Sequence, residues 1–213
     1  MDFLPAGISA YSEAHTEEEP VFLAELRRET WQKVLVPRML SGHFQGRVLS
    51  FLSHLLRPSR ILEIGTYTGY SAICLAEGMA DDGQLHTIDI NELLATIQAK
   101  YFEKAGIADK VVCHLGDARE IIPKLNQTWD LVFIDADKEN YINYYDKVID
   151  HVRPGGLIIF DNVLWSGKVT EPVEENDRET KTLAELNQAV HQDRRVVNLL
   201  LPVRDGLMIL RKL

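Results

Sequence analysis

A charged cluster near the middle of the chain is the first candidate for chemistry. It lies in the segment FIDADKENY, residues 133–141, at the end of the apolar run Leu131–Ile134. That run is typical of a buried strand, yet Asp135, Asp137 and Lys138 follow it within four positions. Removing charges from water is costly unless they are paired or bind a metal. The cluster is therefore either a surface ion pair or a site in which Asp135 binds a metal beside Lys138 as a base.

A second candidate group follows the next apolar run. Asp161 and Asn162 come directly after Leu157–Phe160. If the two runs are neighbouring parallel strands, their carboxyl ends meet at one edge of the sheet, which brings these side chains close to Asp135. Carboxylate and amide oxygens are the ligands of hard cations such as Mg²⁺, Mn²⁺ or Ca²⁺. Each group alone is more simply a surface turn, but the two together favour a cation site.

The segment LEIGTYTGYS, residues 62–71, indicates a cofactor site at the end of an earlier strand. A glycine turn between a strand and a helix is typical of nucleotide-type cofactors. The dinucleotide pattern requires small residues where Tyr67 and Tyr70 stand, and a tyrosine at position 67 would block the approach of a pyrophosphate. The turn around Gly65 therefore favours a cofactor without phosphates.

Further strand ends suit an adenosine. Asp89 stands 24 positions after Gly65 and could accept hydrogen bonds from both ribose hydroxyls. The segment 116–118 ends the third strand, where an adenine ring would lie, and the acidic Glu63 suits a positive charge. A strand-terminal aspartate is most often a helix cap, but four such ends in strand order support a site. An adenosine with a cationic sulfonium and no phosphate is S-adenosylmethionine, and we expect this cofactor.

Alternating apolar runs and amphipathic stretches must position these side chains. From residue 60 onward, five strands alternate with four helices, which is typical of a parallel, doubly wound sheet. Strands are expected at 61–62, 85–88, 111–113, 131–134 and 157–160, and helices at 70–79, 92–105, 118–125 and 141–152. Residues 196–201 and 207–210 are expected to add an antiparallel hairpin, so that the α/β sheet has seven strands in all.

The segments outside the alternating pattern are expected to extend a single domain. We expect one domain over residues 1–213, with extra N-terminal helices up to residue 57, two of them within 16–57, and the sheet from residue 58. Residues 166–181 are polar and acidic, and we expect a loop that borders the acceptor or a second subunit.

Composition excludes several classes of protein. The 213 residues carry a formal net charge of −9, which disfavours broad binding to nucleic acid or to anionic lipid. Cys74 and Cys113 have apolar neighbours and are expected to be buried, reduced thiols. The chain has no segment typical of a signal peptide or a membrane span, so we expect a cytoplasmic protein.

Three motifs together resemble a known family. The segments LEIGTYTGYS, IDADKENY and DNVLWSG are similar to the cation-dependent class I O-methyltransferases of the caffeoyl-CoA and catechol O-methyltransferase type. The resemblance covers roughly residues 35–213. It implies a Rossmann-like, mostly parallel sheet and a homodimer. It also implies that Asp135, Asp161 and Asn162 hold the cation and that Lys138 is the catalytic base.

The same resemblance implies a set of contacts with S-adenosylmethionine. The residues placed there are Met39, Ser41, Glu63, Gly65, Thr66, Ser71, Asp89, Ala118, Asp135 and Asp137. Around Ser166 and within residues 41–46 the chain departs from the plant caffeoyl-CoA enzymes, and both places are close to the expected acceptor. The identity of the acceptor is therefore left open.

The sequence thus predicts an enzyme that transfers a methyl group from S-adenosylmethionine to a hydroxyl of a small catechol-type or phenylpropanoid acceptor. One alternative keeps the chemistry but modifies a hydroxylated base of tRNA, and the acidic charge argues against it. A second alternative is a non-catalytic module that binds an adenosine cofactor or NAD. Tyr67 argues against NAD, and Lys138 beside a cation site argues against a silent binder.

Overall fold

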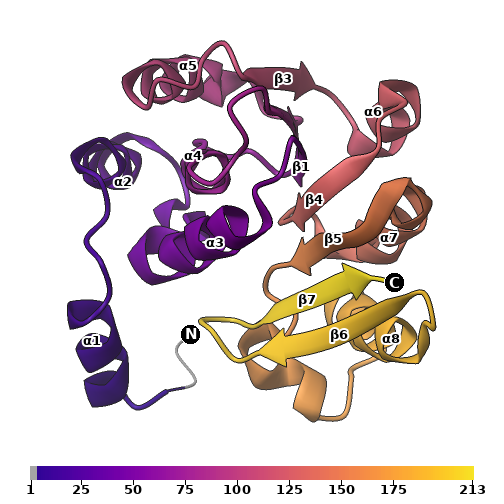
Figure 1. Cartoon of the computed structure of the whole chain (residues 1–213). Coiled ribbons are helices and arrows are strands. Elements are labelled where there is room, and N and C mark those ends of the chain that lie inside the picture. The colour runs from indigo at the N-terminus through magenta and orange to yellow at the C-terminus, as the bar shows by residue number, and fades with distance from the viewer. Residues whose placement is uncertain (1–3) are drawn as a thin grey trace.

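A computed structural model describes residues 4–213 as helices packed around one sheet (Figure 1). The strands are β1 (Arg60–Ile64), β2 (Gln84–Asp89), β3 (Val111–Leu115), β4 (Trp129–Ile134), β5 (Val152–Phe160), β6 (Val196–Leu201) and β7 (Leu207–Lys212). The α-helices are α1 (Ala6–Ala14), α2 (Val21–Lys33), α3 (Gly42–Leu56), α4 (Tyr70–Ala76), α5 (Ala95–Lys104), α6 (Ala118–Leu125), α7 (Tyr141–Val148) and α8 (Arg178–Gln192). Short 3₁₀ turns η1 (Pro37–Met39), η2 (Glu92–Leu94), η3 (Lys138–Asn140), η4 (Ile149–His151) and η5 (Trp165–Thr170) lie in the connections.

The sheet has seven strands in the order β3-β2-β1-β4-β5-β7-β6. Strands β1 to β5 pair in parallel, and β7 pairs antiparallel with both β5 and β6. This confirms the predicted mostly parallel sheet and its C-terminal hairpin. The order of the strands reverses between β1 and β4, and ligands of such sheets bind at the carboxyl ends beside that reversal.

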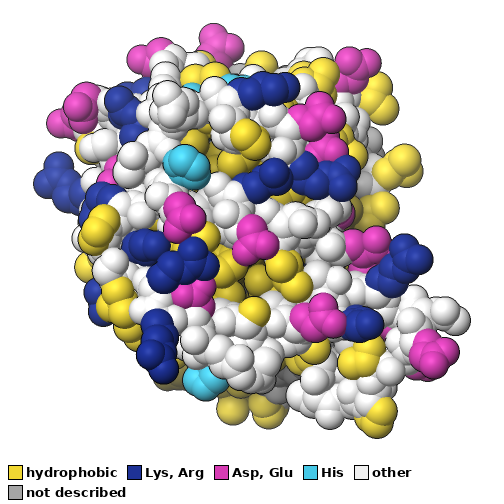
Figure 2. Space-filling model, turned by 90° about the vertical axis from the view of Figure 1, so that its right-hand side faces the viewer, with side chains coloured by type: hydrophobic (Ala, Val, Ile, Leu, Met, Phe, Trp, Pro, Cys, Tyr) yellow, Lys and Arg dark blue, Asp and Glu magenta, His cyan; other side chains and the backbone are white. Residues whose placement is uncertain are grey.

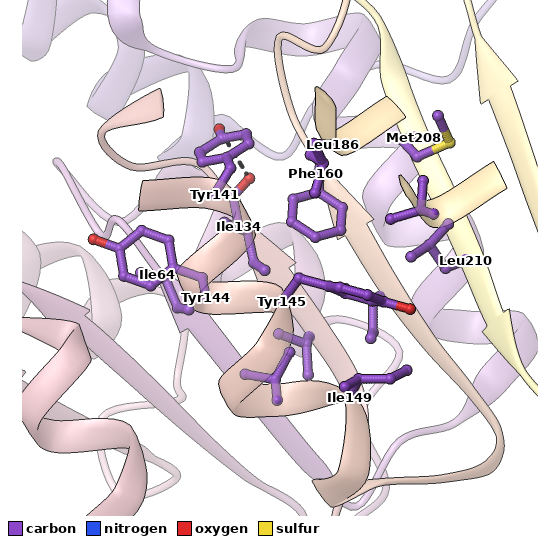
Figure 3. Close-up of a cluster of buried hydrophobic side chains, with 14 of the residues drawn as sticks. Ile64, Ile134, Tyr141, Tyr144, Tyr145, Ile149, Phe160, Leu186, Met208 and Leu210 are labelled. Carbon is purple, nitrogen blue, oxygen red and sulfur yellow. Dashed lines mark hydrogen bonds between the residues drawn. The ribbon is translucent and has the colours of Figure 1, made fainter. Parts of the chain in front are cut away.

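Helices cover both faces of the sheet, because successive side chains of a buried strand point to opposite sides. Val132 belongs to the cluster that includes side chains of α6, α7 and α8. Figure 3 shows Tyr145 and Leu186 of this cluster. The next residue, Phe133, belongs to the other cluster, with side chains of α2, α3, α4 and α5. Strand β4 is packed on both faces, and this packing fixes the position of the residues that follow it.

Three features differ from the expectations. Helix α8 follows the acidic segment because Asp177 accepts a hydrogen bond from the Thr180 amide at 3.1 Å and the helix buries an apolar stripe that includes Leu186. Helix α1 precedes the two expected N-terminal helices and buries no residue. Cys74 is buried as predicted, but the prediction for Cys113 is wrong, since it is exposed on the edge strand β3.

The molecular surface carries charged side chains of both signs. On the face shown in Figure 2, basic and acidic side chains are interspersed, and no continuous basic surface is visible there. None of the helices within residues 4–213 has the length and the apolar character needed to cross a membrane.

Candidate active site

A cavity of about 1440 Å³ opens at the carboxyl ends of the central strands. Pockets for one small molecule are usually roughly 300–1000 Å³, so this cavity has room for a cofactor and an acceptor together. Eight of the residues predicted to form the site line it: Met39, Gly65, Asp89, Asp135, Asp137, Lys138, Asp161 and Asn162. The glycine-turn residue Gly65 and the candidate cation ligands thus face one space.

Gly65 is required by a close approach of two strand ends. Its φ is +100°, and a Cβ atom at this position would lie 1.9 Å from the carbonyl oxygen of Asp135. Any larger residue would push the end of β4 away from β1. The glycine therefore holds the glycine turn and the first predicted cation ligand side by side.

Asp89 is oriented by backbone donors at the end of β2. Its Oδ2 accepts a hydrogen bond from the Tyr67 amide at 2.7 Å, and its Oδ1 accepts one from the Asn91 amide at 2.9 Å. A carboxylate has about four acceptor positions, so both oxygens can accept further donors. Asp89 is thus an oriented acceptor on the cavity wall, and its contact with a ribose stays a prediction.

Five of the predicted cofactor residues lie outside the set that lines the cavity. They are Ser41, Glu63, Thr66, Ser71 and Ala118, all of them buried. Glu63 accepts hydrogen bonds from the hydroxyls of Ser71 at 2.6 Å and Thr87 at 2.5 Å behind the glycine turn. Burial raises the pKa of the Glu63 carboxyl to about 8. Direct contact of these five residues with the cofactor stays a prediction.

The candidate cation ligands are placed by the register of two strands. Ile134 of β4 pairs with Phe160 of β5, so Asp135 and Asp161 follow at adjacent strand ends. Asn162 comes next with φ +60°, a left-handed conformation that asparagine tolerates better than most residues. Residues 4–213 contain no cluster of three or more His, Cys, Asp or Glu side chains suited to a metal. The candidate set therefore depends on the side-chain amide oxygen of Asn162 as its third ligand.

Asp161 is the most confined of these ligands. It is 2% exposed, and burial raises the pKa of its carboxyl to about 7, with the charge of Asp135 acting in the same direction and Lys138 opposing it. Its Oδ2 accepts a hydrogen bond from Gln45 Nε2 at 2.6 Å, and its Oδ1 accepts one from the backbone N–H of Asn162 at 2.7 Å. Two neighbouring carboxylates are chemically suited to a divalent cation.

Lys138 is fixed at the cavity wall by two partners. Its Nζ donates to Asp135 Oδ1 at 2.9 Å and to the Tyr141 hydroxyl at 2.6 Å. That hydroxyl lies 3.2 Å from the carbonyl oxygen of Ile134 (Figure 3). It also lies 3.0 Å from the carbonyl oxygen of Asp161, so it joins the ends of β4 and β5. Sequence reasoning did not select Tyr141, although its position three residues after Lys138 was a usable signal.

A further part of the cavity wall comes from the chain after β5 and from the hairpin turn. Trp165 and Ser166 are consecutive residues with φ of +48° and +57°, and both line the cavity. The Ser166 amide donates to Asp205 Oδ1 at 2.5 Å, which ties the start of the predicted 166–181 loop to the hairpin. His43 is absent from this wall and lies 2.7 Å from the carbonyl oxygen of Glu17. Trp165 and Ser166 therefore border the cavity, and His43 does not.

Asp137, the remaining predicted cofactor residue at this edge, is held by side chains of the segment that follows it. Its carboxylate accepts a hydrogen bond from the Tyr144 hydroxyl at 2.6 Å and another from Nδ2 of the Asn140 side chain. Tyr144 also lines the cavity. The carboxylate of Asp137 is thus oriented at the rim and available to a polar group of the cofactor.

Known proteins resemble the chain along most of its length. Residues 12–213 match the family described as O-methyltransferase. Caffeoyl-CoA O-methyltransferase 5 of Nicotiana tabacum is 37% identical over 206 residues, covering 92% of this chain and 85% of the relative. Caffeoyl-CoA O-methyltransferase 2 of Eucalyptus globulus is 38% identical over 205 residues, covering 91% and 83%.

Solved structures show the same architecture. The O-methyltransferase of Bacillus cereus in complex with SAH superposes with a TM-score of 0.88 at 28% identity, covering 97% of each chain. The SAH-bound methyltransferase PaMTH1 of Podospora anserina gives a TM-score of 0.89 at 28% identity, covering 100% of this chain and 99% of that one.

Proposed function

The chain belongs to the O-methyltransferase family, and we propose that it transfers a methyl group from S-adenosylmethionine to one hydroxyl of a small catechol-type or phenylpropanoid acceptor. One observation carries the proposal. Asp135, Lys138, Asp161 and Asn162 line the same cavity as the glycine turn at Gly65. The groups needed for proton transfer, cation binding and cofactor binding therefore share one space.

S-adenosylmethionine would occupy the part of the cavity beside β1 and β2. Asp89 offers two oriented oxygens to the ribose hydroxyls, and Gly65 lines the same part of the cavity. Met39, which is 58% exposed at the cavity edge, would cover the cofactor from the η1 side. Cofactor-bound relatives of the same fold support this placement.

The oxygens of Asp135, Asp161 and Asn162 fit a divalent cation such as Mg²⁺, Mn²⁺ or Ca²⁺. Two carboxylates and one amide match the ligand preference of these ions, and both carboxylates are at the cavity wall. A bound divalent cation would supply positive charge that lowers the pKa of an acceptor hydroxyl. The caffeoyl-CoA O-methyltransferase relatives are consistent with this role.

Residues of the chain supply proton transfer and orientation. Lys138 accepts the proton of one acceptor hydroxyl at Nζ, which lies 2.6 Å from the Tyr141 hydroxyl. The acceptor oxygen then attacks the methyl carbon, and the carbon–sulfur bond breaks with its electron pair moving to sulfur. The products are a methyl ether and S-adenosylhomocysteine, and the proton on Lys138 passes to solvent. Alignment of the oxygen with the methyl group accounts for much of the rate.

The experiment compares a catechol with a matched monophenol, caffeic acid against p-coumaric acid, in the presence of Mg²⁺ or Mn²⁺. Two adjacent hydroxyls can fill two cation positions, whereas one hydroxyl keeps its rotational freedom, so we expect a rate difference of roughly 100-fold or more. Removal of divalent ions by chelation should abolish turnover. Asp161→Ala should do the same while S-adenosylhomocysteine still binds, and the exposed Asp81→Ala serves as the matched control.

Four outcomes would contradict parts of this proposal. Equal rates for the two acceptors would exclude chelation of the acceptor, and full turnover after exhaustive chelation would exclude the cation. Methylation of a hydroxylated tRNA base in place of either phenol would retain the chemistry and replace the acceptor. Binding of S-adenosylhomocysteine without methyl transfer to any of them would favour a non-catalytic binding module.

A homodimer completes the proposal. Helix α1 buries no residue within the chain, and its apolar side chains Ile8 and Tyr11 are 52% and 65% exposed. Figure 1 shows α1 standing apart from the layers around the sheet. An exposed apolar helix is typical of an interaction surface. Light scattering should give the mass of two chains, and Tyr11→Asp should shift it toward one.

A further inference from the structure

We propose that Gln45 is a positioning residue that orients Asp161 toward a divalent cation. The inference rests on the proposed cation site and adds a residue that no motif of the chain contains. Gln45 belongs to α3, which supplies none of the candidate cation ligands, and it lies 116 positions before Asp161 in the chain.

The contact between the two side chains is short and fully buried. Gln45 is 0% exposed, Asp161 is 2% exposed, and Nε2 of the amide lies 2.6 Å from Oδ2 of the carboxylate. A buried carboxylate without a donor is costly, and an amide is the neutral side chain that supplies one at this reach. The contact therefore satisfies Oδ2 of Asp161 and holds this side chain in one position.

The second oxygen of Asp161 is held as well. Oδ1 accepts a hydrogen bond from the Asn162 amide at 2.7 Å, while Oδ2 accepts from Gln45. With one donor on each oxygen, the plane of the carboxylate is fixed. The acceptor positions that remain are available to the cavity that Asp161 lines. Outer partners of this kind commonly set the orientation of ligating carboxylates.

Arg204 determines which end of the Gln45 amide faces Asp161. Its Nη1 lies 3.4 Å from Gln45 Oε1, so the oxygen of the amide faces a donor and the nitrogen is directed to the carboxylate. The same guanidinium donates to the carbonyl oxygen of Leu40 at 2.9 Å and to that of Ser41. One hydrogen-bond network thus links the β6–β7 turn, helix α3 and the predicted cofactor segment, and it ends at Asp161.

The rival explanation is that Gln45 only satisfies buried polar atoms and has no bearing on the cation. Gln98 shows what such a role looks like, since it is 6% exposed and donates to the Tyr67 carbonyl oxygen at 2.7 Å, away from the candidate ligands. The two explanations differ in one observable. A positioning residue changes the affinity for the cation more than the affinity for the cofactor.

The test measures Mn²⁺ dissociation constants by calorimetry on the full chain, together with those of S-adenosylhomocysteine. Gln45→Glu replaces the donor by a second carboxylate and should weaken Mn²⁺ binding by roughly 10- to 100-fold. Affinity for S-adenosylhomocysteine should stay within about twofold, because Gln45 is not among the predicted contacts of the cofactor. Gln188→Glu makes the same charge change on the exposed face of α8 and should alter neither constant.

A second variant separates orientation from charge repulsion and from folding. Gln45→Met keeps the length of the side chain, removes both hydrogen bonds and adds no charge, and it should weaken Mn²⁺ binding by several-fold to about tenfold. In methyl transfer, both variants should raise the Mn²⁺ concentration at half-maximal rate, and saturating Mn²⁺ should restore much of kcat.

The outcomes distinguish this inference from the proposed function. If the wild-type protein binds neither Mn²⁺ nor Mg²⁺, the proposed cation site is wrong. If the wild type binds Mn²⁺ and a folded Gln45 variant binds it equally well, the site stands and the positioning role is overturned. The role is also overturned if Mn²⁺ and S-adenosylhomocysteine affinities fall together with the melting temperature, because that pattern indicates a purely structural contact.

Discussion

The buried carboxyl of Glu63 should make the stability of the protein fall as the pH rises. Glu63 is 0% exposed, and burial raises its pKa from 4.5 to about 8 in the folded chain. Below pH 4.5 the carboxyl is protonated in both the folded and the unfolded chain, and its titration does not change the free energy of unfolding. Between pH 4.5 and 8 the unfolded chain releases this proton while the folded chain retains it, so the free energy of unfolding decreases.

The size of the effect follows from the two pKa values. The interval from 4.5 to about 8 corresponds to roughly 4 to 5 kcal/mol in the free energy of unfolding, reached near pH 8 and constant above it. Glu63→Gln removes the titration and keeps a side chain that can bond to the hydroxyls of Ser71 and Thr87. The variant should match the wild type near pH 5 and exceed it by several kcal/mol at pH 9.

The assay is equilibrium urea unfolding of the cofactor-free protein at intervals from pH 5 to pH 9. The measured quantity is the difference in free energy of unfolding between Glu63→Gln and wild type at each pH, which cancels the titration of other groups. Glu103→Gln, at an exposed position of α5, is the control and should show a constant difference. A constant difference for Glu63→Gln as well would refute the reasoning that Glu63 is kept neutral by burial.

The remaining predictions concern catalysis, packing and acid stability. Lys138→Met should lower kcat by roughly 10²- to 10⁴-fold, with a loss that shrinks at high pH and an unchanged affinity for S-adenosylhomocysteine; a loss independent of pH would contradict a role as base. Gly65→Ala should unfold the protein or separate β1 from β4, because its Cβ would lie 1.9 Å from the Asp135 carbonyl oxygen, whereas Gly7→Ala, with open space around it, should leave the melting temperature unchanged or higher. Burial lowers the pKa of His86 from 6.5 to about 4, so the folded chain binds fewer protons than the unfolded chain in that interval. Stability should therefore fall by about 1 to 2 kcal/mol as the pH drops from 6.5 to 4, and His86→Gln should remove this part of the acid sensitivity in urea unfolding.

Much of the fold and part of the site follow from local pattern. The alternation of apolar runs and amphipathic stretches predicts a parallel sheet, and the carboxyl ends of parallel strands meet at one edge whatever the loops do. For this reason the sequence alone assigns Gly65, Asp89, Asp135 and Asp161 to one edge, and all four line the same cavity. Their placement depends only on where each strand ends.

Helix α8 was within reach of the same reasoning but was not predicted. Asp177 at its start and the buried positions Leu183, Leu186 and Val190 form an ordinary capped, amphipathic pattern. The acidic residues before it favoured the interpretation as a loop. The exposure of Cys113 could not be predicted from the local sequence, because an apolar strand segment does not indicate whether the strand lies at the centre or at the edge of its sheet.

The partners of the site residues could come only from the packed structure. Gln45 and Asp161 are 116 positions apart, and Arg204 reaches Gln45 across a further long separation. Spacing along the chain predicts that two side chains meet only when both belong to the same helix or strand. Gln45, Asp161 and Arg204 belong to α3, the end of β5 and the β6–β7 turn, so their contacts could not be predicted in this way. Glu63 shows the same limit, since its side chain is sealed behind the glycine turn by hydroxyls from α4 and β2. Strand ends are placed by periodicity, whereas burial and hydrogen-bond partners depend on which layers pack against each other.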